Sequence, residues 1–198
     1  MVTYTISRCS GKPAWDSIPA LNIDAELFHR EHAVKAWAQL SYDENALYVR
    51  LQAAEEHVRA EHRGLLDEIC EDSCLEFFFC PMEGDDRYFN LEVNPNGAMY
   101  FGFGKSVQTL QRLIPENPAV NPEVTRTDDG WSLEYAIPHD FVRLFFPAYK
   151  PESGNVIKAN CYKCADLSET PHWLCWSSVP AERATFHCPE HFGTMYFE

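Results

Sequence analysis

Long apolar segments are missing from this sequence. No run in the 198 residues approaches the roughly 18 consecutive apolar residues that a membrane-spanning helix needs. The opening residues, MVTYTISRCSGKPAW, also lack the basic start and apolar segment of a secretory signal. We therefore expect no membrane partner and, if the cysteines are reduced, a cytoplasmic location.

Basic residues are scarce as well. There are 16 lysines and arginines against 30 aspartates and glutamates, which gives a formal net charge of −14. A field of this sign repels the phosphates of nucleic acids and of anionic membranes, so we expect no nucleic-acid partner. The charge is compatible with neutral sugars or with cations. The sequence carries no signal of its oligomeric state.

Motifs for the common nucleotide and hydrolase chemistries are absent. The chain has no Gly-x-Ser-x-Gly, no phosphate-binding loop and no dinucleotide fingerprint. It also has no internal repeat and no linker rich in Gly, Ser or Pro. With 45% hydrophobic and 14% aromatic residues, the composition is that of a globular protein. We expect one domain over residues 1–198.

Eight cysteines are present, but their spacing indicates no metal site. Cys161 and Cys164 form a C-x-x-C within a strand pattern, where residues i and i+3 point to opposite faces. That arrangement suits neither a zinc knuckle nor a thioredoxin-like helix start. We expect thiols, with some disulfide as the alternative. The eight are Cys9, Cys70, Cys74, Cys80, Cys161, Cys164, Cys175 and Cys188.

Alternating apolar and polar residues predict strands along most of the chain. Residues 36–41 and 47–52 alternate around a polar turn at 43–45, which predicts a β-hairpin. One short helix is expected over residues 139–146. About ten short strands with frequent turns predict an all-β sandwich or barrel. The other strands are expected over 2–6, 74–80, 88–94, 98–103, 124–126, 131–137, 156–164, 173–177 and 193–197.

Strand parity gathers polar and aromatic residues on one sheet face. In residues 88–94, Phe89, Leu91 and Val93 form the apolar set, which we expect to face the core. Amides and carboxylates form paired hydrogen bonds to sugar hydroxyls, and aromatic rings stack on a pyranose. A plain solvated or loop-covered face is the alternative. The outward residues from three strands are Glu76, Asn90, Glu92, Asn160 and Tyr162.

Six short segments in a fixed order resemble the family 9 carbohydrate-binding modules, especially the stand-alone family 9-like proteins. The similarity runs over roughly residues 12–198. The segments are Leu47-Tyr48-Val49; Glu71-Asp72-Ser73-Cys74-Leu75-Glu76-Phe77-Phe78; Tyr88-Phe89-Asn90-Leu91-Glu92 with Asn94-Pro95-Asn96-Gly97; Trp131-x-x-Glu134-x-x-Ile137-Pro138; Asn160-Cys161-Tyr162 with Trp176; and Phe186-His187-x-Pro189-x-x-Phe192-Gly193.

The resemblance implies an immunoglobulin-like antiparallel β-sandwich with long loops and one or two short helices. It also implies a site in which two aromatics clamp a terminal sugar above acidic and amide groups. By position, Phe186 is one clamp aromatic. The loop that should supply the other, residues 55–71, contains no aromatic, so Trp173 is the reserve candidate for the second wall. Glu76, Asn90 and Glu92 match the polar floor by position, and Tyr162 or Cys164 lies near a further polar position.

Some members of the family carry structural calcium, and the chain has acidic turns such as Asp85-Asp86 and Asp128-Asp129. Calcium favours oxygen-rich loops, but Asp is also an ordinary turn residue, and no EF-hand spacing is present. We expect no cofactor and keep calcium as a less favoured alternative.

Non-catalytic binding of a mono- or oligosaccharide is the function we expect. Two alternatives remain. Glu76 and Glu92 could be the two carboxylates of a glycoside hydrolase. A haem or other small ligand between the sheets could use Met99 and His172.

Overall fold

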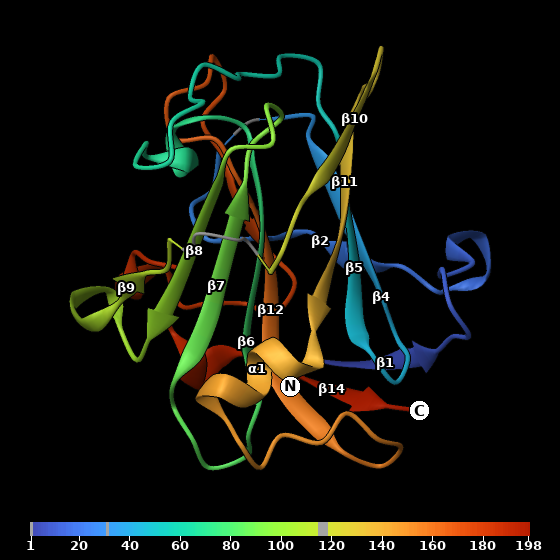
Figure 1. Cartoon of the computed structure of the whole chain (residues 1–198). Helices are drawn as coiled ribbons and strands as arrows, with labels where there is room; N and C mark the ends of the chain where they lie inside the picture. Colours follow the sequence, from blue (N-terminus) through green and yellow to red (C-terminus); the bar gives the residue numbers. More distant parts are fainter. Residues whose placement is uncertain (1, 31, 115–118) are drawn as a thin grey trace.

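The computed structural model describes residues 2–30, 32–114 and 119–198, and most of its regular structure is β-strand (Figure 1). We call one group of strands the first sheet. It runs β3-β13-β12-β6-β7-β8-β9, and β14 pairs with the start of β12. Its strands are β3 (Ala25–Glu26), β6 (Cys74–Cys80), β7 (Tyr88–Val93), β8 (Met99–Gly104), β9 (Gln111–Arg112), β12 (Val156–Cys164), β13 (Trp173–Cys175) and β14 (Gly193–Phe197).

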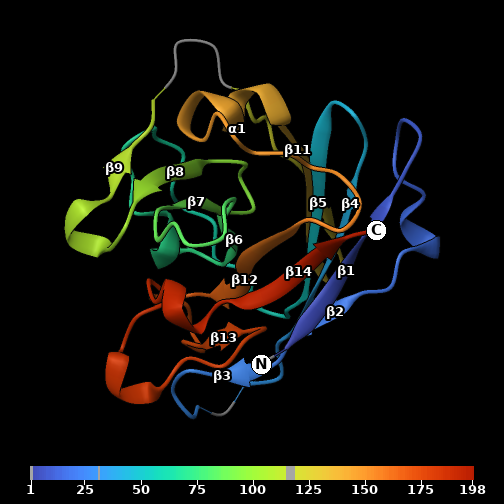
Figure 2. The same ribbon diagram turned by 90° about the horizontal axis from the view of Figure 1, so that it is seen from below.

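The second sheet packs against the first and runs β10-β11-β5-β4-β2. Strand β1 (Thr3–Arg8) joins the two sheets, because it pairs in parallel with both β14 and β4. Figure 2 shows β1 at the edge where they meet. The strands of the second sheet are β2 (Leu21–Ile23), β4 (Lys35–Tyr42), β5 (Ala46–Ala54), β10 (Glu123–Thr127) and β11 (Gly130–Pro138).

The predicted all-β sandwich is confirmed, and so are its local hairpins. Strands β4 and β5 pair around Asp43, whose carboxylate accepts hydrogen bonds from the backbone N–H groups of Asn45 and Ala46. Strands β10 and β11 pair around residues 128–129. The Asp43 carboxylate is therefore occupied by the turn itself, as Asp commonly is.

The core lies between the two sheets and follows the period-2 pattern of the strands. Leu47, Val49 and Leu51 of β5 face Leu75 and Phe77 of β6 across it, and all are buried. This burial supplies most of the favourable free energy of folding.

A short helix, α1 (His139–Phe145), caps one end of the core. Phe145 packs on Phe89 and Phe103, with ring centroids 5.2 and 4.7 Å apart. Trp131 and Trp176 are buried. No helix in the described part of the chain is long and apolar enough to cross a membrane. Short 3₁₀ turns lie at Trp15–Ser17, Ile69–Glu71, Val107–Thr109, Ala181–Arg183 and Pro189–His191.

The outer face of the first sheet carries a second apolar layer that strand patterns did not predict. Phe78 on this face is fully buried, because the chain from Ser177 to Phe192 folds back over it. Figure 2 shows this red segment against the side of the first sheet that faces away from β4 and β5. All eight cysteines have free thiols.

Candidate functional site

Cross-strand register places the five predicted polar residues on one face of the first sheet. Glu76 lies directly opposite Glu92 on β7 and Tyr162 on β12. Phe78, two residues along β6, lies opposite Asn90 and Asn160 in the same way. Directly opposed residues in antiparallel strands point to the same side. The five residues therefore share one face of the sheet, as strand alternation predicted.

A cavity of about 190 Å³ opens over part of this face. Its walls are mostly apolar and its floor is acidic. Four of the seven predicted site residues line it, namely Glu76, Glu92, Trp173 and Phe186. The remaining lining residues are Leu27, Phe28, Cys70, Cys164, Asp166, Ala184, Thr185 and His187.

Each aromatic wall is held by packing behind it. Phe186 stacks on Tyr162 with ring centroids 4.2 Å apart and planes 16° from parallel. Trp173 meets Phe28 edge-on at 5.5 Å, and its indole N–H donates to Asp166 Oδ1 over 2.6 Å. Both rings are therefore fixed in orientation, which lowers the entropy lost when a ligand stacks on them.

The acidic floor holds its carboxyl groups in a desolvated setting. Burial raises the pKa of Glu76 well above its ordinary value, and the nearby Glu92 raises it further. Burial also raises the pKa of Glu92 to about 7, although the Asn90 amide, 2.8 Å from its Oε1, acts in the opposite direction. Burial raises the pKa of Asp166 as well. Near neutral pH such carboxyl groups can both donate and accept hydrogen bonds.

Three predicted partners lie on the expected face but outside the cavity. Tyr162 is fully buried beneath Phe186 and donates its hydroxyl to the Phe186 carbonyl. The Asn160 amide is used by Ser177, to whose carbonyl it donates and from whose N–H it accepts. Asn90 donates to Glu92 and is likewise buried. For Tyr162 and Asn160, the chain that covers the face has taken their hydrogen-bonding groups, so these two can only position their neighbours. Asn90 is committed to Glu92 through its amide nitrogen, and its buried Oδ1 has no hydrogen-bond partner among the described residues.

Sequence reasoning missed Phe28 and Asp166. Asp166 continues the outward series that runs through Asn160, Tyr162 and Cys164, so extending strand parity by one step would have found it. Phe28 had no such signal, because it reaches the cavity through the long-range pairing of β3 with β13.

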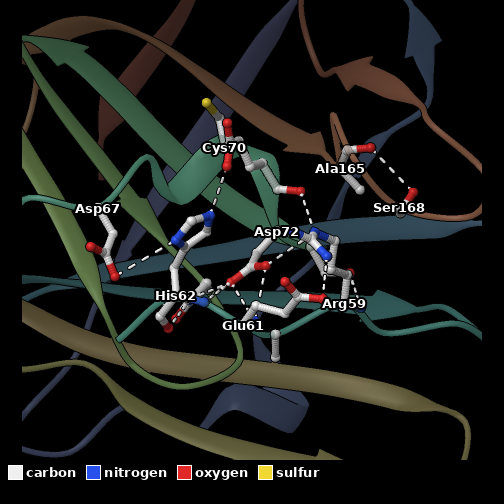
Figure 3. Close-up of polar contacts among 12 residues, drawn as sticks. Arg59, Glu61, His62, Asp67, Cys70, Asp72, Ala165 and Ser168 are labelled. Carbon is white, nitrogen blue, oxygen red and sulfur yellow. Dashed lines mark hydrogen bonds and ion pairs between the residues drawn. The ribbon is translucent and has the colours of Figure 1, made fainter. Parts of the chain in front are cut away.

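The loop over residues 55–71 has a structural anchor in place of a clamp aromatic. The fully buried Asp72 carboxylate accepts hydrogen bonds from the N–H groups of Glu61 and His62 and from Asn94 Nδ2, over 2.8–3.0 Å. Figure 3 shows Asp72 at the centre of these contacts, with the Cys70 sulfur directed away from them. Within this loop, Cys70 is the residue that lines the cavity.

A second hollow of about 640 Å³ adjoins the cavity and shares Thr185 and His187 with it. The His187 ring contacts Phe78 at 5.1 Å, and its Nδ1 lies 2.8 Å from the Tyr88 hydroxyl. Burial lowers the pKa of His187 to about 4. The imidazole that separates the two hollows is therefore uncharged near neutral pH.

The residues considered for haem are not arranged to hold it. His172 is fully buried with both ring nitrogens engaged: Nε2 accepts from Lys163 at 2.8 Å, and Nδ1 donates to the Thr170 carbonyl at 2.7 Å. Met99 lies on β8 and packs against the core.

The chain is thus a curled β-sandwich with an aromatic-walled, acid-floored cavity on one outer face. Residues 14–197 match the model of carbohydrate-binding family 9, and the chain belongs to that family.

Solved structures agree with this assignment. A proposed carbohydrate-binding protein from Bacteroides uniformis is 27% identical, with a TM-score of 0.84 and 99% of both chains covered. A family 9 carbohydrate-binding module from Caldicellulosiruptor kristjanssonii shares the fold at 13% identity and a TM-score of 0.70. It was solved with glucose and with cellotriose, and the alignments cover 100% of this chain and 96% and 94% of those chains. Among curated proteins, no significant match is found.

Proposed function

We propose that the protein binds carbohydrate without transforming it, holding one terminal sugar ring in the cavity between Trp173 and Phe186. The hydroxyl groups of that ring form hydrogen bonds with the carboxyl groups of Glu76, Glu92 and Asp166. The observation that carries this proposal is the cavity itself, which combines two fixed aromatic walls with a floor of closely spaced carboxyl groups. Stacking and paired hydroxyl bonds are the two interactions that sugar recognition needs.

The size of the cavity favours one ring rather than a buried chain. Its volume of about 190 Å³ is below the range of roughly 300–1,000 Å³ typical of sites for drug-sized ligands. Further units of an oligosaccharide would extend into the adjoining hollow past His187. The glucose and cellotriose complexes of the Caldicellulosiruptor module support a choice of neutral glucose-type sugars as first probes.

Calorimetric titration with glucose and cellotriose tests the proposal. We expect at least one of them to bind with a Kd of about 1 mM or tighter, which is about −4 kcal/mol. Phe186→Ala should weaken binding at least about tenfold, because a stacking face is lost. Tyr196→Ala is a matched control, since Tyr196 is 43% exposed on β14 and does not line the cavity. Unchanged affinity in Phe186→Ala would place the sugar elsewhere.

The glycoside hydrolase alternative has weaker support. A retaining enzyme needs one carboxylate ionised as the nucleophile and a second carboxyl as the acid. Here burial raises the pKa of both Glu76 and Glu92, so neither is favoured as the charged partner. Release of reducing sugar from an oligosaccharide, abolished by Glu76→Gln, is the result that would favour catalysis.

A further inference from the structure

Two thiols and a carboxyl group meet at the base of the cavity. Cys74 and Cys164 lie directly opposite each other on β6 and β12, and Glu76 is two residues further along β6 on the same face. All three side chains are buried. Rigid strands rather than loops hold this cluster, so its geometry is set by the sheet.

The spacing of the three groups fits a single metal ion. The Cys164 sulfur is 3.0 Å from Glu76 Oε1, and the three potential ligand atoms all lie within 4.8 Å of one another. Zinc binds sulfur at about 2.3 Å and carboxylate oxygen at about 2.0–2.2 Å, which places neighbouring ligands of a tetrahedron roughly 3.5–4 Å apart. Small side-chain adjustments would therefore convert the cluster into three ligands.

The charge balance around the cluster also favours a cation. The cavity lining contains three carboxyl groups, and among the described lining residues there is no Lys or Arg. The nearest residue on β12 with an ammonium group is Lys163, but it faces the opposite side of the sheet and is bound to Glu55. Lys163 acts electrostatically on Glu76 and Arg112 on Glu92, but neither cation lines the cavity. Buried carboxyl groups with no cation in direct contact keep a proton or acquire a cation.

We propose that Cys74, Cys164 and Glu76 form a binding site for one zinc-like divalent cation. Two sulfurs and one oxygen are a donor set that zinc accepts and that calcium and magnesium do not prefer. Binding converts both thiols to thiolates and Glu76 to its carboxylate, and the protons released go to solvent. The fourth position faces the cavity, where Glu92, Asp166 or water completes the tetrahedron. The site does not depend on the sugar proposal.

Cobalt(II) is the direct probe, because its bonds to thiolates produce charge-transfer absorption in the near ultraviolet. Metal-free protein, kept reduced with a phosphine, should take up one equivalent of Co²⁺ with that absorption, and Zn²⁺ should displace it. Cys74→Ser and Cys164→Ser should each weaken Co²⁺ binding more than about 100-fold, beyond the roughly 10–100-fold expected when a residue that only orients a ligand is changed.

Controls distinguish this site from the other thiols. Cys188→Ser and Cys80→Ser remove buried thiols outside the cluster and should leave the cobalt spectrum unchanged. Glu76→Gln retains both sulfurs and the side-chain size, so it tests the oxygen ligand if a cysteine variant fails to fold; it should weaken binding at least about tenfold. Absence of thiolate absorption in the wild-type protein overturns the proposal, as does an unchanged spectrum in both cysteine variants or in Glu76→Gln.

Discussion

At the scale of single residues, Lys163 and Glu55 form an ion pair inside the sandwich. The Lys163 ammonium is 3.2 Å from Glu55 Oε2 and also donates to His172 Nε2 and to the Cys164 carbonyl. Glu55 further accepts from Ser73 and Trp131. Every partner is buried, so removing any one of these side chains leaves a buried polar or charged group without its hydrogen-bond partner.

Lys163→Met should therefore destabilise the protein by about 3–5 kcal/mol, because it leaves Glu55 buried without its cation. Urea unfolding followed by tryptophan fluorescence gives the free energy. Lys105→Met is the control: Lys105 is 57% exposed and pairs with the exposed Asp86, so its loss should cost less than about 1 kcal/mol. If Lys163→Met also lowered the free energy of unfolding by less than about 1 kcal/mol, water would have to reach Glu55, which would contradict the prediction.

The raised pKa of Glu92 predicts a pH dependence. Its pKa is about 7 in the folded protein and ordinarily 4.5, so its stabilising contribution is complete below pH 4.5 and is lost as pH rises through 7. From pH 5 to pH 8, the wild-type protein should lose up to about 3 kcal/mol relative to Glu92→Gln.

Comparison with Glu92→Gln isolates this effect. Gln keeps an oxygen for the Asn90 amide, and both proteins share the buried histidines. Those histidines act oppositely: burial lowers the pKa of His187 to about 4, so its contribution is lost as pH falls from 6.5 to 4. Parallel pH–stability curves for the two proteins would show that Glu92 is ionised in the fold.

At the scale of elements, the loop over residues 55–71 depends on Asp72. Asp72→Ala should remove three hydrogen bonds to a buried carboxylate and cost about 2–3 kcal/mol. Hydrogen exchange should show loss of protection at the Glu61 and His62 amides. In the control Asp67→Ala, the loss of protection should be confined to Arg63 and Gly64, because their backbone N–H groups donate hydrogen bonds to the Asp67 carboxylate. Retained protection at Glu61 in Asp72→Ala would contradict this anchoring role.

Strands and hairpins were predictable because their signals are local. The turn at 43–45 and the alternation on either side of it specify β4 and β5 without reference to the rest of the chain. The cover formed by residues 177–192 was not predictable, because it rests on contacts such as Phe186 with Tyr162, 24 residues apart in sequence. For the same reason, parity placed Asn160 on the correct face but could not show that Ser177 occupies its amide.

At the scale of the whole molecule, the two faces of the first sheet have different roles. Its inner face joins the second sheet in the core, and its outer face carries the cavity under a separate apolar layer. The segment order that resembles family 9 modules predicted the architecture, including the position of Phe186. It could not predict that Trp173 on β13 and Phe28, which follows β3, would line the cavity where the loop over 55–71 has no aromatic.

The central claim is that a sugar ring lies between Trp173 and Phe186. Glucose or cellotriose titrated into ¹⁵N-labelled protein tests it most directly, through the indole N–H signals of the five tryptophans, with Trp173 assigned from Trp173→Phe. We predict a saturable shift of the Trp173 signal, while Trp15 and Trp37, which do not line the cavity, stay in place. A saturable shift at Trp15 or Trp37 with no change at Trp173 would contradict the account.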